Sequence, residues 1–177
     1  MLNLGTLGAS LVLGIAALGS GIGINIAGQA TIGAWKKCFL NKKPAQMMLI
    51  AFTGNPLTQV FYAYILMNHI MGVARNYPAG KWVYLAFSLA AGIALMATAI
   101  IQGKLAANSV ESLAETGKGF AQYMTVMGVA EAVALFAMVL TMTSVVPIGD
   151  SIEAMKAAVS VEAIEAVIPA AIETIIP

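Results

Sequence analysis

The chain has 177 residues, of which 60% are hydrophobic and only 10% are charged, and its formal net charge is +1. A soluble domain of this length needs many more charged side chains to cover its surface, so the composition predicts a membrane protein. The small net charge and the lack of a basic stripe interleaved with aromatics argue against a nucleic-acid-binding role. The single cysteine, Cys38, excludes an intrachain disulfide.

Four apolar segments follow one another along the chain, and each has the roughly 20 residues that a membrane-crossing helix needs. They are residues 4–34, 45–74, 82–103 and 119–146. The breaks between them are short, which predicts an all-α membrane protein built of two helical hairpins, residues 4–74 and 82–146, followed by a tail, residues 147–177. Because residues 1–35 carry no charged side chain and form a full span, we expect the first span to be retained rather than cleaved as a signal peptide.

Lysine and arginine are unevenly divided between the breaks. Four lysines lie in residues 36–44, and Lys104 and Lys118 bound the third break, residues 104–118, whereas the second break has only Arg75 and Lys81. Cytoplasmic loops carry the excess of Lys and Arg. We therefore predict that loops 36–44 and 104–118 are cytoplasmic and that both termini lie on the opposite side of the membrane.

The two hairpins resemble parallel copies of one unit. Residues 19–22 align with residues 97–100, and Thr58-Gln59 aligns with Ala130-Glu131. Small residues recur in the first and third spans, which predicts close helix packing and leaves open a tightly packed inner ring of helices. These small residues are Gly14, Gly19, Gly21, Gly23, Gly28 and Gly33 in the first span, and Ala94, Ala97, Gly103, Ala106 and Ala107 in the third.

Glu131 is the acid placed deepest in a predicted span. It follows the start of the fourth span by about 12 residues, or roughly 18 Å at the helical rise, which is near the middle of the hydrocarbon layer. A charge there costs on the order of 3 kcal/mol, so protonation, a bound cation or a partner base must neutralise it. The sequence places no lysine or arginine at that depth, and a protonated glutamic acid that only links two helices is the structural alternative.

Polar neighbours favour ion binding over that alternative. Gln59 stands at the repeat position equivalent to Glu131, Thr58 precedes it, and Gln102 lies in the otherwise apolar third span. Carboxylate, amide and hydroxyl oxygens are the ligands of small hard cations, whereas a proton needs only the carboxyl and one acceptor. Pro56 removes one helical N–H donor, so we expect the Phe52 carbonyl to lose its usual partner and the backbone to distort.

The remaining polar and aromatic residues of the spans receive simpler interpretations. We expect His69 to lie at the membrane interface rather than in a proton relay. The aromatic residues are interpreted as interface or packing side chains, namely Tyr62, Tyr64, Trp82 and Tyr84.

The sequence resembles the proteolipid of V-type and A-type rotary ATPases, known as K or c, in its duplicated four-helix form. The resemblance covers about residues 5–146 and rests on four motifs, one in each span. They are residues 19–23 (GSGIG), residues 56–59 (PLTQ), residues 101–104 (IQGK) and residues 129–131 (VAE). A midmembrane glutamate on the fourth helix, with glutamine at the matching place on the second, is a fairly specific combination.

This resemblance implies a ring of several copies that turns against a stator membrane subunit supplying an arginine, while a central-stalk subunit meets the cytoplasmic loops. The chain itself then is not an enzyme and binds no nucleotide; it carries Na⁺ or H⁺ on Glu131 while the complex hydrolyses or makes ATP. In sodium-binding members the coordinating set resembles Glu131, Gln102, Thr58, Gln59 and the backbone carbonyl of Asn55. All five positions are filled here, although sodium-binding relatives commonly have an apolar residue at position 55, where the ligand is the carbonyl. Na⁺ is therefore the expected ion, and sodium coupling together with a lone cysteine makes a prokaryotic inner membrane the expected location.

Two alternatives and one unexplained region remain. A small stand-alone secondary transporter or channel would use Glu131 as a proton or sodium site, and a structural scaffold would use it only as a hydrogen-bonding residue. The resemblance does not cover residues 147–177, which carry five acidic residues and one lysine. An amphipathic helix on the membrane, a plug of the ring opening and a disordered extension are the three interpretations of this tail.

Overall fold

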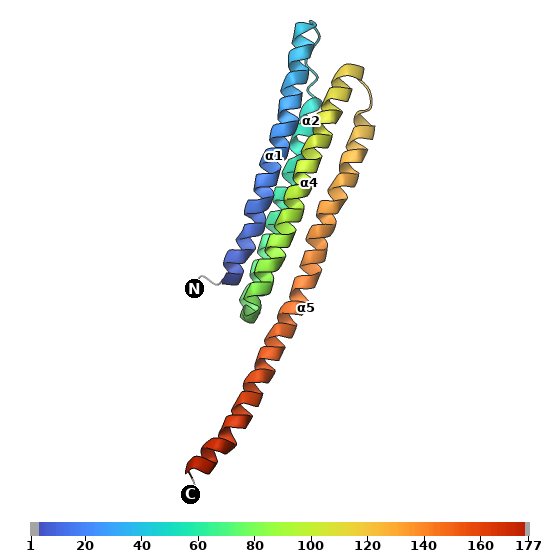
Figure 1. The fold of residues 1–177 in the computed structure, drawn as a ribbon. Helices are drawn as coiled ribbons and strands as arrows, with labels where there is room; N and C mark the ends of the chain where they lie inside the picture. Colours follow the sequence, from blue (N-terminus) through green and yellow to red (C-terminus); the bar gives the residue numbers. More distant parts are fainter. Residues whose placement is uncertain (1–3, 176–177) are drawn as a thin grey trace.

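The computed structural model describes the backbone of residues 4–175 and the side chains of residues 4–160. Within these residues all the regular secondary structure is helical, and the long helices, joined by short turns and loops, run side by side (Figure 1). The helices are α1 (Leu4–Leu40), α2 (Leu49–Gly54), the short 3₁₀ helix η1 (Asn55–Leu57), α3 (Thr58–Asn76), a second 3₁₀ turn η2 (Pro78–Gly80), α4 (Lys81–Thr116) and α5 (Phe120–Ile175). The all-α prediction is confirmed.

Three helical stretches of the described residues are long and apolar enough to cross a membrane, namely Leu4–Leu40, Pro78–Thr116 and Phe120–Ser160. The second predicted span, residues 45–74, contains an interruption at Pro56, where a distortion was expected. The 3₁₀ helix η1, which contains Pro56, divides it into α2 and α3. Proline has no N–H to continue the α-helical hydrogen-bond ladder, so the chain tightens at this point and then resumes as α3.

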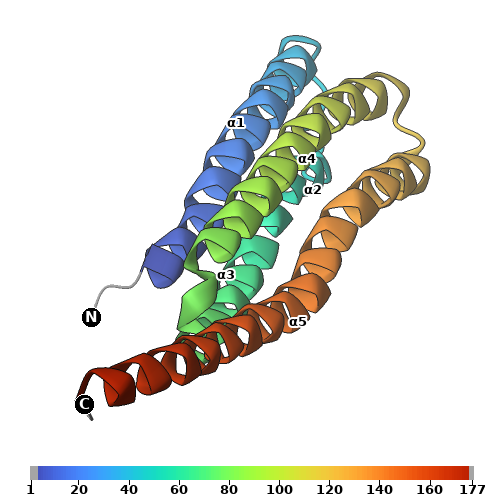
Figure 2. The ribbon, with the colours of Figure 1, turned by 60° about the horizontal axis from the view of Figure 1, so that its bottom comes forward.

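The helices form a four-cornered bundle in which α1 and α4 run parallel and make the most extensive contact (Figures 1 and 2). The other close neighbours are α1 with α3, α4 with α5, and α3 with α5, so α1 and α5 lie at opposite corners. Each hairpin therefore contributes one helix to the α1–α4 pair and one to the α3–α5 pair. This arrangement is what two parallel copies of one hairpin produce.

Glycines let α1 approach its neighbours more closely than any side chain permits. A Cβ placed on Gly19 would lie 2.5 Å from the Cα of Met96, and one placed on Gly103 would overlap the backbone of Gly23. Gly23 also faces Pro56 of η1, 2.9 Å from a Cβ built at Gly23, so three segments of the chain meet at this glycine. The predicted close packing of small residues is confirmed here, and in lipid such contact surfaces hold helices together by dispersion.

Not every glycine of α1 has this role. Gly14, Gly21 and Gly33 face no atom within 4 Å that a Cβ would meet. These three glycines lie on the open side of α1, and the inner ring of helices stays a prediction.

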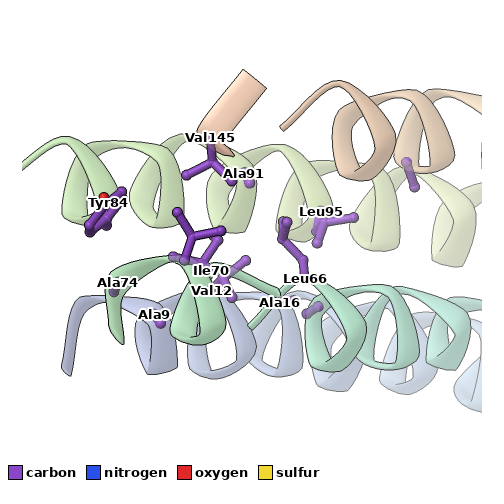
Figure 3. Packing of buried hydrophobic residues seen from close by; sticks show 13 residues of the cluster. Ala9, Val12, Ala16, Leu66, Ile70, Ala74, Tyr84, Ala91, Leu95 and Val145 are labelled. Atoms are coloured by element: carbon purple, nitrogen blue, oxygen red, sulfur yellow. The ribbon is translucent and has the colours of Figure 1, made fainter. Parts of the chain in front are cut away.

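Two apolar clusters lie at different heights in the bundle. The first joins α1, α3, α4 and α5 around the side chains drawn in Figure 3. Its labelled members are Ala9, Val12, Ala16, Leu66, Ile70, Ala74, Tyr84, Ala91, Leu95 and Val145. The second cluster lies nearer the α1–α2 loop and includes Leu49, Phe52, Val110 and Met127. Between the two clusters, on η1, α3, α4 and α5, lie the polar residues of the candidate site.

Helices extend beyond the predicted ends of the spans. The first predicted span ends at residue 34, but α1 continues to Leu40, and α4 continues to Thr116 through most of the predicted third loop. Lys104 is therefore a helical residue with an exposed side chain, not part of a loop. An apolar run ends where the chain leaves the hydrocarbon layer. A helix can continue beyond that point, because its backbone hydrogen bonds also form in water. Gly117, in the left-handed conformation with φ 66°, ends α4.

The predicted tail, residues 147–177, continues α5 as a helix as far as Ile175 and extends past the end of the bundle at which α1 begins (Figure 1). Its first turns are anchored. The Ala79 backbone N–H donates to Glu153 Oε2 at 3.1 Å, and Tyr84, whose hydroxyl donates to the Tyr77 carbonyl at 2.7 Å, packs against Gly149. Residues 176–177 of the tail lie outside the described residues.

Candidate functional site

The short helix η1 is where the site begins, and its geometry corrects one prediction. The Phe52 carbonyl was expected to lose its partner because of Pro56, but it accepts the backbone N–H of Asn55. A tighter, three-residue hydrogen bond thus replaces the four-residue one that Pro56 prevents. Pro56 is buried against α1 at Gly23, so the interruption is held in place by packing.

The residues that follow η1 form a chain of hydrogen bonds toward α4. Thr58 Oγ1 donates to the Asn55 carbonyl at 3.0 Å and also lies 3.3 Å from Gln59 Oε1. Gln59 Nε2 in turn donates to Gln102 Oε1 at 2.7 Å. Both glutamines are fully buried. The close approach of Gly103 to Gly23, one residue along α4, is what brings Gln102 within reach of Gln59.

Glu131 enters the site from α5 and meets a residue of α3. The Tyr62 hydroxyl donates to Glu131 Oε1 at 2.6 Å, a length typical of a hydrogen bond to an ionised or strongly accepting oxygen. Glu131 is half-buried in the single chain, because one side of α5 is not covered by the other helices. It is the twelfth residue of α5, about 16 Å from the helix start at 1.5 Å per residue.

Four of the five predicted site residues are therefore brought into one network, namely Asn55, Thr58, Gln59 and Gln102. The fifth, Glu131, is joined to α3 through Tyr62; within the described residues no hydrogen bond links it directly to the other four. Within the described residues, the second carboxyl oxygen of Glu131 accepts no hydrogen bond. Gln102 Nε2, which is buried, also has no partner there.

Sequence reasoning missed Tyr62, which it interpreted as an interface or packing aromatic. A signal was present, because Tyr62 follows Gln59 by three residues and residues three apart share one face of a helix. His69, expected at the membrane interface, is half-buried and its Nε2 lies 3.1 Å from the Met142 carbonyl, so it joins α3 to α5.

The chemistry of this arrangement is that of oxygen ligands for a small cation. One carboxylate, two carboxamides, one hydroxyl and one main-chain carbonyl come from α3, η1, α4 and α5, and none of them is a soft ligand. Clusters of three or more His, Cys, Asp or Glu are absent from the described residues, so a transition-metal centre of those ligands is not formed there. A single carboxylate in a buried amide and hydroxyl setting suits a monovalent cation or a proton.

The fold and the site define an all-helical membrane protein with one carboxylate inside its bundle. Comparison with known proteins points to one family. Residues 85–143 match the family model of the C subunit of ATP synthase. The chain is also similar to the A-type ATP synthase subunit K of Methanocaldococcus jannaschii, with 32% identity over 140 residues.

That alignment covers 78% of this chain and 60% of the relative, so the chain spans about three fifths of the length of the curated relative it matches. The family match includes Gln102 and Glu131, which lie on α4 and α5. Both matches support a proteolipid of a rotary ATPase, as the resemblance to that family predicted.

Proposed function

We propose that this chain is a rotor-ring subunit of a V-type or A-type rotary ATPase or ATP synthase and that it carries a cation across the membrane on Glu131. Several copies form the ring, and each turn of the ring moves every carboxylate from one access path to the other. The chain hydrolyses no ATP and binds no nucleotide. The observation that carries the proposal is the carboxylate of Glu131, which accepts a hydrogen bond from Tyr62, three residues along α3 from Gln59 of the buried Gln59–Gln102 pair.

The ion that we propose is Na⁺, with H⁺ as the alternative. A chain of hydrogen bonds supports this choice, because it runs from the Asn55 carbonyl through Thr58 and Gln59 to Gln102 Oε1 with donor–acceptor distances of 3.0, 3.3 and 2.7 Å. A sodium ion would substitute for these donors as the shared partner of the oxygens and would neutralise Glu131. A proton on Glu131 would need only one acceptor, so most of these oxygen atoms would have no role in binding it. The number of oxygen atoms therefore favours sodium.

The proposed partners follow from the ring. A stator membrane subunit with an arginine would displace the ion from Glu131 as each copy passes, because a cation beside the carboxylate competes with the bound ion. A central-stalk subunit would bind the end of the bundle that carries Lys36, Lys37, Lys42 and Lys43, which we propose to be cytoplasmic. Both described ends of the chain then lie toward the other side of the membrane.

The mass of the detergent-solubilised assembly tests the ring. We expect a particle whose protein mass is a several-fold multiple of the 18.3 kDa chain, measured by native mass spectrometry after detergent removal in the gas phase. A closed ring follows from identical head-to-tail contacts between copies. A particle containing one chain or two would contradict the proposal, and ion-driven solute uptake by that particle alone would support a stand-alone transporter instead.

Chemical labelling tests the ion. A carbodiimide reacts with a protonated carboxyl group, so at fixed pH we expect NaCl to slow modification of Glu131 several-fold while KCl at equal ionic strength does not. Peptide mass spectrometry locates the label, and the exposed Glu115, in the same sample, serves as the internal control. Equal labelling rates in both salts would reject sodium and leave the proton version of the proposal.

A further inference from the structure

Two polar side chains of α3 point out of the bundle at a depth where the membrane offers them no partner. Tyr64 is 55% exposed, and Asn68, one turn further along, is also exposed. Asn68 Nδ2 donates to the Tyr64 carbonyl at 2.9 Å. Among the described residues, no donor reaches Asn68 Oδ1 and no acceptor reaches the Tyr64 hydroxyl. The chain by itself thus leaves an amide oxygen, an amide N–H and a phenol unsatisfied on this face.

The depth of this face follows from the helix geometry. Asn68 precedes the end of α3 at Asn76 by eight residues, or about 12 Å at 1.5 Å per residue. The hydrocarbon layer is about 30 Å thick, so Asn68 lies well inside it when α3 ends near the interface. An unpaired polar group in hydrocarbon is costly, because no water is present to bind it. Protein must therefore cover the face in the assembled molecule.

A matching group lies at the same height on α5. His69 Nε2 contacts the Met142 carbonyl, so residues 68–69 of α3 and residues 142–143 of α5 lie at the same height along the bundle. Thr143 is exposed, and its hydroxyl donates to the Val139 and Leu140 carbonyls of its own helix, at 3.1 Å each. The Thr143 oxygen keeps lone pairs that can accept a hydrogen bond from an amide N–H.

The duplicated hairpins indicate which protein brings the two together. Helices α3 and α5 occupy equivalent places in the two hairpins and pack side by side within the chain. In a ring of identical copies the same relation continues from chain to chain, so the free side of α3 meets the free side of α5 of the adjacent copy. A head-to-tail contact of this kind joins two different faces, as Asn68 and Thr143 require.

We propose that the Tyr64–Asn68 face of α3 is part of the contact between copies and that the Asn68 amide donates to Thr143 of the adjacent copy. The proposal rests on the ring inferred above, and it adds the polar contact that holds neighbouring copies together at mid-depth. Interhelical hydrogen bonds between amide and hydroxyl side chains are a known means of fixing helix pairs in lipid.

The test measures the temperature at which the purified ring dissociates in SDS, for Asn68→Leu, Thr143→Val and the double variant. We expect each single variant to lower it by roughly 2–4 °C, and the double variant to lower it no further than the larger single effect, because both remove one shared bond. Asn68→Gln, which keeps an amide, should restore part of the loss. Ser10→Ala is the matched control, since the exposed Ser10 hydroxyl is satisfied by the Leu7 carbonyl at 2.7 Å.

The outcomes separate this inference from the proposed function. Unchanged dissociation temperatures, or strictly additive losses, would overturn the contact while leaving the ring itself established. A ring of normal stability that loses ATP-driven ion transport in the whole complex would show that a different protein of the complex lies against this face, and would also overturn it. If Asn68→Leu fails to fold, Thr143→Val and Asn68→Gln still decide, and a wild-type chain that forms no ring refutes both proposals.

Discussion

Glu131→Gln is expected to abolish ion-coupled ATP hydrolysis by the assembled complex. The substitution keeps the size of the side chain and an oxygen that can accept the Tyr62 hydroxyl, which lies 2.6 Å from the carboxylate. A carboxamide carries no charge and cannot take up or release a cation, so no ion can be moved however well the ring assembles. We expect transport into vesicles at background level, with ring mass unchanged.

The control for that experiment is Glu115→Gln, which makes the same chemical change on the surface. Glu115 is 69% exposed and pairs with Lys37 at 3.8 Å, a contact of little energetic value. Transport should stay within about twofold of wild type. Full activity of Glu131→Gln would assign the glutamate a structural role, as in the scaffold alternative, and would end the rotor proposal for this residue.

The sequence predicted the type of fold because the membrane leaves few choices. Long apolar runs can only be helices where no water satisfies the backbone, and short breaks force neighbouring helices to pack. The helices α1 and α4 extend beyond the predicted spans, to Leu40 and Thr116, because a helix can continue past the hydrocarbon layer. Polarity marks the membrane boundary, and it does not mark the last helical residue.

The candidate site was predictable in part for a similar reason. A polar side chain inside an apolar run has a high free-energy cost in the membrane. Gln59, Gln102 and Glu131 could therefore be identified from the sequence without knowledge of the fold. Tyr62 did not, because a tyrosine is common at membrane interfaces and only its three-residue spacing from Gln59 set it apart. The prediction for the Phe52 carbonyl was wrong because a 3₁₀ turn can accommodate a proline. In this turn the Asn55 N–H donates to the Phe52 carbonyl, and no sequence rule requires that hydrogen bond.

The site also depends on residues that carry no chemistry. Gln59 and Gln102 lie on different hairpins, and their 2.7 Å contact exists only because α1 fits between η1 and α4 without side chains at Gly23 and Gly103. The glycines and the carboxamides are thus parts of one arrangement. Wider spacing of α1 and α4 is expected to draw the two carboxamides apart.

Gly103→Ala is expected to disrupt both packing and ion binding. The added Cβ would overlap the Cα and carbonyl of Gly23, and because these are main-chain atoms, α1 and α4 must move apart. Overpacking of this kind typically costs about 1–3 kcal/mol, more than the roughly 1 kcal/mol by which alanine favours a helix over glycine. We expect a lower thermal stability of the detergent-solubilised ring and a loss of sodium protection at Glu131 in the carbodiimide assay.

Gly128→Ala provides the comparison, since position 128 is also helical and a Cβ there meets nothing within 4 Å in the chain. It carries the same gain in helix propensity without the collision, so its stability should equal or exceed that of wild type. The difference between the two variants isolates the cost of separating α1 from α4. If both variants retain wild-type stability and sodium protection, the close approach at Gly23 is not what holds Gln102 against Gln59.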